Sequence, residues 1–114
     1  MKRFNIILAF LLLSLSALAQ KGDAVLGIWQ SEHGNGRIQI YKTGNEYNGK
    51  LVWTKKALDE SGKPNLDVNN PNESLRSQPI KGLEVLKDFT YKSEGTWDGG
   101  TVYDPRSGKT YSAA

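Results

Sequence analysis

Residues 36–54 read GRIQIYKTGNEYNGKLVWT, and this stretch determines the fold class that the sequence predicts. In its first half, Ile38 and Ile40 alternate with polar residues, which is typical of a β-strand with one buried face. A tight turn is predicted at Thr43-Gly44-Asn45, because the last two residues tolerate a positive φ. The second half alternates again, and its residues predicted to share one face are Tyr47, Gly49, Leu51 and Trp53. Two alternating runs joined by such a turn predict an antiparallel β-hairpin.

Other short strand-like runs lie on either side of the hairpin, separated by Gly, Asn, Asp and Pro residues. They are residues 25–31, 82–86, 88–92, 95–103 and 109–114. The pair Gly99-Gly100 interrupts one run and predicts a bulge or sharp bend. The stretch Asp104-Pro105-Arg106-Ser107-Gly108 predicts a turn. Because no helical periodicity of useful length follows residue 19, the sequence predicts an all-β, antiparallel barrel or sandwich.

Residues 55–80 form a polar segment that holds three of the four prolines. Within it, Asn70, Pro71 and Glu73 fit the start of a short helical turn, with Asn70 as the N-cap. Pro79 is expected beyond the end of that turn. The sequence therefore predicts one long loop with a short helical turn, and loops of this length in small domains usually carry function.

The N-terminus has the three parts of a secretory signal peptide. Two basic residues, Lys2 and Arg3, precede the apolar run 4–19, which ends on the small-x-small pattern Ala17-Leu18-Ala19. Cleavage between Ala19 and Gln20 is predicted. The alternative is a membrane anchor, but the run is shorter than the roughly 20 residues that span a bilayer. We therefore expect a periplasmic or secreted protein without stable membrane insertion after cleavage.

The remaining residues, 20–114, are long enough for one β domain. The chain contains no cysteine, which excludes disulfides and a cysteine-linked lipid anchor. Loss of Lys2 and Arg3 reduces the 15 basic residues to 13, against 12 acidic residues. Since these basic residues are also dispersed, the sequence predicts no nucleic-acid partner. The sequence contains no pattern that predicts an oligomeric state.

Several short motifs lie along the chain: Gly27-Ile28-Trp29, residues 47–53 (YNGKLVW), residues 67–71 (DVNNP), Leu75-Arg76, residues 79–83 (PIKGL) and residues 97–112 (WDGGTVYDPRSGKTYS). Together these segments resemble the bacterial family labelled domain of unknown function 2147. The resemblance implies an exported protein of Gram-negative bacteria with a lipocalin-like β-barrel and no established enzymatic activity. Members of this family usually continue for two or three further strands, so the resemblance also implies a partial barrel that lacks its last strands.

Catalytic chemistry has little support in the sequence. The single histidine, His33, lies among glycines in a predicted turn, and no nucleophile or carboxylate is spaced to form a triad with it. Asp98 and Asp104 flank a predicted strand and are the only candidates for a carboxylate pair. Asp104 precedes a proline and is better explained as the start of a turn. We therefore predict that the protein is not an enzyme.

Oxygen ligands for a metal ion are present in Asp67, Asn69 and Glu73, and their spacing is similar to the start of a calcium-binding loop. However, Pro71 occupies a ligand position of that loop, and Asn72 occupies the position that requires glycine. Caps and turns explain these residues better. The sequence predicts no metal and no cofactor.

Aromatic residues on the predicted strands provide the one positive indication of a site. The candidate ligand-binding residues are Trp29, Tyr47, Trp53, Trp97 and Tyr103. Packing in the core and lining of a pocket are both open interpretations of them. We predict a non-enzymatic binding protein for a small hydrophobic or amphipathic ligand, such as a fatty acid. The alternatives are a structural or protein-interaction module of the cell envelope and, with less support, an enzyme acting on envelope glycans.

Overall fold

The computed structural model describes residues 21–93 and 95–113. Seven strands form one antiparallel sheet in the order β1-β2-β3-β4-β6-β7, and β5 pairs with β4 beside this path. The elements are η1 (Asp23–Val25), β1 (Gly27–Gln30), β2 (Gly36–Thr43), β3 (Glu46–Thr54), η2 (Glu73–Leu75), β4 (Glu84–Ser93), β5 (Thr96–Asp98), β6 (Thr101–Asp104) and β7 (Lys109–Ser112). The all-β, antiparallel class predicted from the sequence is confirmed. The predicted signal peptide and its cleavage point between Ala19 and Gln20 lie outside the described residues.

The hairpin predicted over residues 36–54 is present as β2 and β3. Its pairing runs from Gly36 opposite Thr54 to Thr43 opposite Glu46. Gly44 has a φ of 60°, whereas Asn45 does not adopt a positive φ. The turn therefore needs glycine only at its first central position, as in a type II′ turn.

In the second half of the sheet, one prediction from the sequence is confirmed and another is wrong. Gly99-Gly100 separates β5 from β6, as the sequence predicted. By contrast, the predicted runs 82–86 and 88–92 are one continuous strand, β4. Asp88 lies within β4 with a φ of 65°, and the pairing with β3 shifts register there. The strand continues through this irregularity because the Asn48 side chain accepts a hydrogen bond from the backbone N–H of Asp88 at 2.9 Å.

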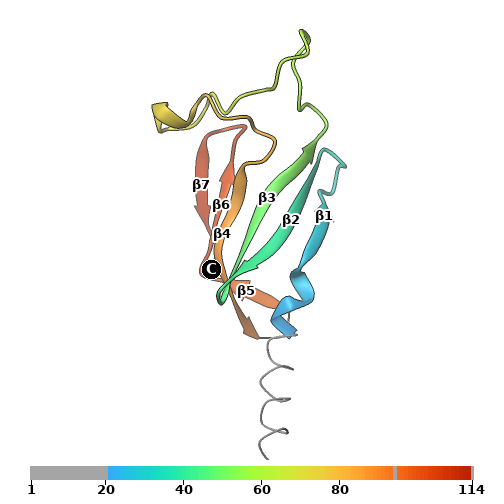
Figure 1. Cartoon of the computed structure of the whole chain (residues 1–114). Helices are drawn as coiled ribbons and strands as arrows, with labels where there is room; N and C mark the ends of the chain where they lie inside the picture. The colour runs from blue at the N-terminus through green and yellow to red at the C-terminus, as the bar shows by residue number, and fades with distance from the viewer. Residues whose placement is uncertain (1–20, 94, 114) are drawn as a thin grey trace, which may run out of the picture.

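The sheet curves without closing (Figure 1). Strands β1–β3 form one half and β4, β6 and β7 form the other, and the two halves diverge toward the long segment that crosses the top. Among the described residues, the outer edges of β1 and β7 pair with no further strand. The architecture is therefore the partial barrel that the sequence predicted.

Gly49 lies at the centre of this sheet, where β2, β3 and β4 meet. It is paired with Ile40 on one side and with Leu86 on the other. A Cβ atom at this position would lie 2.9 Å from Ile38 Cγ2 and 2.9 Å from Leu86 Cδ1. Because real contacts are not this short, only glycine allows the side chains of β2 and β4 to meet over β3.

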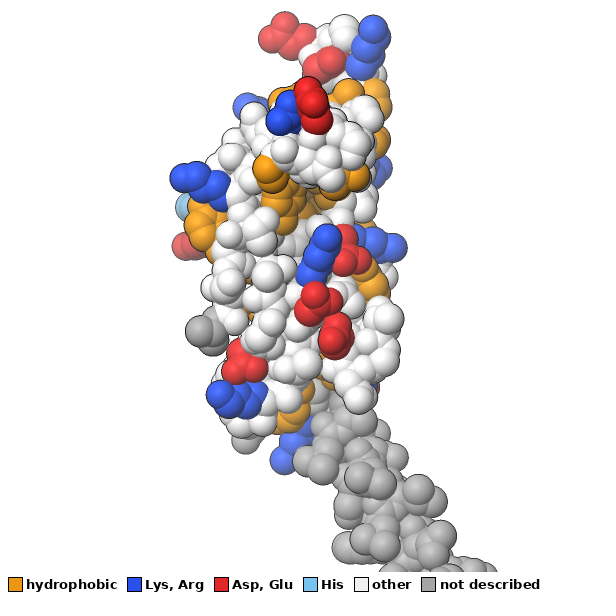
Figure 2. All heavy atoms as spheres, turned by 90° about the vertical axis from the view of Figure 1, so that its left-hand side faces the viewer, with side chains coloured by type: hydrophobic (Ala, Val, Ile, Leu, Met, Phe, Trp, Pro, Cys, Tyr) orange, Lys and Arg blue, Asp and Glu red, His pale blue; other side chains and the backbone are white. Residues whose placement is uncertain are grey.

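The long segment after β3 folds back on itself above the sheet. Isolated antiparallel bridges join Leu58 to Pro64 and Leu66 to Pro79. Figure 2 shows hydrophobic side chains gathered in the upper half of the face that carries β7 and η2, where this segment crosses the molecule.

No helix among the described residues is both long and apolar enough to cross a bilayer.

The predicted helical turn exists, but its N-cap was placed two residues too early. The 3₁₀ turn η2 begins at Glu73, and its N-cap is Asn72, whose side chain accepts a hydrogen bond from the backbone N–H of Ser74 at 3.1 Å. Asn70 instead accepts from the backbone N–H of Asn72 and so forms a turn before the cap. Asn70 and Asn72 can each act as a cap by residue type, and the contacts of Asn70 with Asp67 and Asn72 decide between them.

We expect Gly49→Ala to lower the free energy of unfolding by about 1–3 kcal/mol, because the added methyl group forces Ile38 and Leu86 apart. Urea denaturation followed by circular dichroism measures this change. The control is Asn45→Ala, at the neighbouring turn residue, which is exposed and has no positive φ. Equal effects of the two substitutions would contradict the close approach at Gly49.

Candidate functional site

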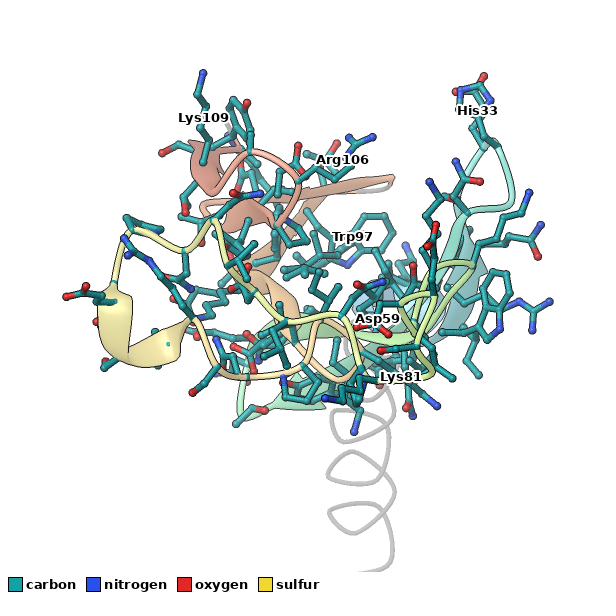
Figure 3. All side chains as sticks on the ribbon, turned by 90° about the horizontal axis from the view of Figure 1, so that it is seen from above. His33, Asp59, Lys81, Trp97, Arg106 and Lys109 are labelled. Carbon is teal, nitrogen blue, oxygen red and sulfur yellow. The ribbon has the colours of Figure 1, made fainter. Side chains whose placement is uncertain are left out.

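An apolar pocket lies inside the lower part of the sheet, near η1 and β5. Its volume is about 170 Å³, and it is lined by Val25, Ile40, Tyr47, Asn48, Leu86, Phe89 and Trp97. The pairing of Tyr47 with Phe89 and of Gly49 with both Ile40 and Leu86 brings its walls together. Seen from above, Trp97 lies between the two halves of the sheet (Figure 3). The pocket thus lies where β2, β3 and β4 run side by side, at the close side-chain contacts that Gly49 permits.

The chain segment before β1 closes the lower end of this pocket. The Trp97 Nε1 donates a hydrogen bond to the backbone carbonyl of Gly22 at 3.0 Å. The Tyr47 hydroxyl donates to Asp23 Oδ1 at 2.6 Å. Val25, in the same segment, contributes its side chain to the lining. The polar atoms of both aromatic rings are therefore engaged by η1 and its preceding residue, which leaves apolar ring surface toward the pocket.

Asp23 is the electrostatic centre of this closure. It accepts hydrogen bonds from the Tyr47 hydroxyl and from Lys42 Nζ, the latter at 2.9 Å, and these hold the pKa of its carboxyl below the usual 3.8. The hydrogen bond to Asp23 raises the pKa of Lys42. Burial, followed by the hydrogen bond to Asp23, raises the pKa of Tyr47. At neutral pH the three groups are thus held as carboxylate, ammonium and neutral phenol.

Trp53 does not line the pocket, because β3 contains a bulge. Arg37 pairs with Trp53 and Ile38 pairs with Leu51, so β3 advances two residues while β2 advances one. This extra residue turns Trp53 to the face opposite Leu51, and the single shared face predicted for residues 46–54 is wrong at its last position. There the Arg37 guanidinium lies 4.9 Å from the centre of the Trp53 ring. Trp53 is partly exposed, and a cation–π contact rather than a pocket accounts for its position.

Trp29 faces the same side of the sheet as Ile38, with which it pairs, but it is 52% exposed and does not line the pocket. Its Nε1 donates a hydrogen bond to the backbone carbonyl of Val25 at 2.7 Å. Trp29 therefore connects β1 to η1 and contacts the pocket wall through Val25. Of the five aromatic residues proposed from the sequence, the structure brings only Tyr47 and Trp97 together at the pocket.

Tyr103 does not line the pocket but takes part in a second, polar site. Its hydroxyl donates to the carboxylate of Asp67 at 2.8 and 3.0 Å from the two oxygens. Asp67 has no solvent exposure, and Asn70 Nδ2 also donates to it at 2.9 Å. Burial, together with the hydrogen bond to Asp67, raises the pKa of Tyr103 to about 12. A buried carboxylate held by two neutral donors fastens the long segment to β6.

The neighbouring residues extend this attachment to the turn between β6 and β7. Asn69 Nδ2 donates to the backbone carbonyls of Pro105 and Arg106, the latter at 3.0 Å. Gly108 lies directly against the backbone of Asn69, where no side chain would fit. Arg76 Nε donates to the backbone carbonyl of Asn70 at 2.7 Å. The polar side chains of residues 67–73 thus form caps, turns and hydrogen bonds that hold the loop in place.

The remaining residues considered for catalysis lie apart. His33 is exposed at the tip of a loop, well away from Trp97 (Figure 3). Asp98 forms an ion pair with Lys92 at 3.3 Å, and Asp104 forms one with Arg106 at 3.2 Å. Among the described residues, no three His, Cys, Asp or Glu side chains gather as metal ligands would. Neither Asp98 nor Asp104 contributes to the pocket lining.

Sequence reasoning missed the aliphatic part of the pocket and Phe89. Val25, Ile40 and Leu86 carry no chemical signal of their own, and their meeting depends on strand register. Phe89 and Leu86 lie three residues apart on β4, yet they face positions only two residues apart on β3. A strict alternation could not have placed both on one face, and only the Asp88 irregularity does so.

The sequence comparison identifies the family. The family model described as "uncharacterized protein conserved in bacteria (DUF2147)" matches residues 27–114. The chain belongs to this family. No curated protein is significantly similar to it in sequence. The DUF2147 match contains every element from β1 to β7, so the pocket and the Asp67 attachment both lie within the family domain, except for Val25 and the rest of η1.

A solved structure supports the fold of this DUF2147 protein. A protein from the human pathogen Helicobacter pylori that belongs to the lipocalin family has a TM-score of 0.60 and 21% sequence identity. The match covers 75% of this chain and 56% of that one, so this chain spans little more than half the length of that structure. At this identity the likeness shows the fold alone. It establishes the lipocalin-like architecture that the sequence resemblance implied.

We expect Tyr103→Phe to lower the free energy of unfolding by about 1–3 kcal/mol, because buried Asp67 loses a donor that nothing replaces. Urea denaturation measures the loss. Tyr111→Phe is the matched control, since Tyr111 is 52% exposed. If both variants retain wild-type stability, Asp67 does not depend on the Tyr103 hydroxyl.

We expect Asp23→Asn to destabilise the protein at pH 7 and to lose this effect in acid. The pKa of Asp23 is lowered from 3.8 by folding, so its contribution is complete above that pH and disappears as the pH falls through the folded value. Unfolding curves of both proteins between pH 2 and pH 7 would show the difference shrinking toward low pH. Glu32→Gln, at an exposed loop residue, should show no such convergence. A constant difference across the range would contradict the role of the carboxylate charge.

Proposed function

We propose that this protein is a non-enzymatic binding protein for a small hydrophobic or amphipathic molecule, of which a fatty acid is one example. The observation that carries this proposal is the pocket that contains Tyr47 and Trp97. Its other walls are the aliphatic or aromatic side chains of Val25, Ile40, Leu86 and Phe89. Concave, mostly apolar sites of this kind are typical of small-molecule binding.

The chemistry of the pocket favours binding over catalysis. The hydroxyl of Tyr47 and the indole N–H of Trp97 both hydrogen-bond to the segment that closes the pocket. The lining therefore offers a ligand apolar surface and no poised nucleophile or base. The lipocalin-like fold and the DUF2147 family agree with a binding role.

We further propose that the protein acts in the periplasm or outside the cell. The support is the signal-like pattern of residues 1–19, which ends at the predicted cleavage point between Ala19 and Gln20. The closure of the pocket by Gly22 and Asp23 fits this proposal, because these residues follow closely after that point. Cell fractionation with N-terminal sequencing of the product tests it, and an uncleaved cytoplasmic product would contradict it.

A second candidate function is an interaction module of the cell envelope. The observation in its favour is that β1 and β7 present outer edges that no other strand among the described residues covers. Edges of this kind can accept a strand from a partner protein. Recovery of one envelope protein in a pull-down, together with no small-molecule binding, would favour this function over the first.

We expect fatty acids to quench or shift the fluorescence of Trp97, because this ring forms a wall of the pocket. The measurement is a titration of the protein produced from the full sequence, with native mass spectrometry to detect a ligand that co-purifies. Trp97→Phe should lose the response, whereas Trp53→Phe should keep it, since Trp53 lies on the other face of the sheet beside Arg37. Absence of any fluorescence response and of any co-purified ligand would reject the proposed function.

A further inference from the structure

We infer that the pocket selects a compact apolar group, comparable to a benzene ring or a short hydrocarbon tail, and excludes the polar part of its ligand. This inference rests on the proposed binding function and specifies the class of ligand. The larger or polar remainder of any longer molecule would lie outside the pocket. Three observations carry the inference: the volume of the pocket, the engagement of its polar atoms and the close packing of its walls.

The volume sets the size of the group that enters. At about 170 Å³ the pocket is close to the roughly 150 Å³ apolar cavity that accommodates benzene. It is smaller than the roughly 300–1,000 Å³ of sites that enclose a drug-sized ligand. A ring or a short tail therefore fills it, whereas a long acyl chain does not fit inside.

The hydrogen bonds of the lining set its polarity. Tyr47 donates to Asp23, Trp97 donates to Gly22, and the Asn48 side-chain oxygen accepts from the backbone of Asp88. Asn48 also borders the pocket, and this hydrogen bond engages its side-chain oxygen. A carboxylate or hydroxyl inside the pocket would lose its hydration without gaining a partner, so polar groups are excluded.

Close contacts with glycine backbones define the shape of the pocket walls. A Cβ at Gly22 would lie 2.5 Å from the Tyr47 hydroxyl oxygen and 3.1 Å from Tyr91 Cβ. A Cβ at Gly49 would lie 2.9 Å from Leu86 Cδ1. The backbone of Gly100 presses equally closely on the ring of Phe89, another wall residue. The backbones of three glycines are therefore packed directly against the wall residues Tyr47, Leu86 and Phe89, which fixes the positions of these side chains.

The test compares three probes, benzene, hexanoate and palmitate, in Trp97 fluorescence and calorimetric titrations of the protein produced from the full sequence. We expect benzene and hexanoate to bind, and palmitate to bind within about tenfold of hexanoate, because the additional methylenes stay outside the pocket. Palmitate binding that is far tighter than hexanoate binding would overturn the size limit while leaving the proposed function intact. No binding of any probe would reject the proposed function itself.

A matched pair of substitutions locates the site. Val25→Phe places a ring in the pocket and should weaken benzene binding by about tenfold or more. Val68→Phe makes the same change at a residue that is 65% exposed in the long segment and should leave binding unchanged. If Val25→Phe does not fold, Phe89→Leu replaces it, and the larger pocket should then favour palmitate over hexanoate more than the wild type does. Loss of binding in Val68→Phe, with none in Val25→Phe, would assign the site to the long segment and overturn the inference.

Discussion

The close approach of three strands at Gly49 is the constraint on which the rest of the structure depends. Ile40 and Leu86 meet Gly49 from the two neighbouring strands, and the adjacent Tyr47 pairs with Phe89. Any larger residue at this position would displace the side chains that form the pocket wall. Few side chains of the described residues are completely buried, so this small domain depends on close contacts between neighbouring strands more than on a large core.

Two attachments of different chemistry hold the ends of the curved sheet. At the lower end, Asp23 accepts from Tyr47 and Lys42 at a partly exposed site, and the contact is electrostatic and dependent on pH. At the upper end, Asp67 is fully buried and accepts from Tyr103, so it positions the long segment over β6. The first attachment closes the pocket and the second holds the loop, so the pocket and the loop depend on separate residues.

The candidate site could be predicted from the sequence only in part. Tyr47 and Trp97 line the pocket, whereas Trp53 lies on the other face and Tyr103 belongs to the Asp67 attachment. All four lie on strands and have the same aromatic character, so residue type could not separate them. The difference comes from one extra residue in β3 before Trp53 and from one irregular position, Asp88, in β4. A single inserted residue reverses the face of every side chain beyond it, and nothing in local sequence marks these insertions.

By itself, the sequence determined the all-β class, the hairpin at 36–54, the bend at Gly99-Gly100 and the family. These features depend on alternation, turn residues and motifs, which act over short distances along the chain. Only the tertiary structure decided that β4 is continuous, that Asn72 rather than Asn70 caps η2, and that Val25, Ile40 and Leu86 share a pocket. The physical reason is register: bulges and close glycine contacts set which residues meet, and they depend on atoms of strands distant in the sequence.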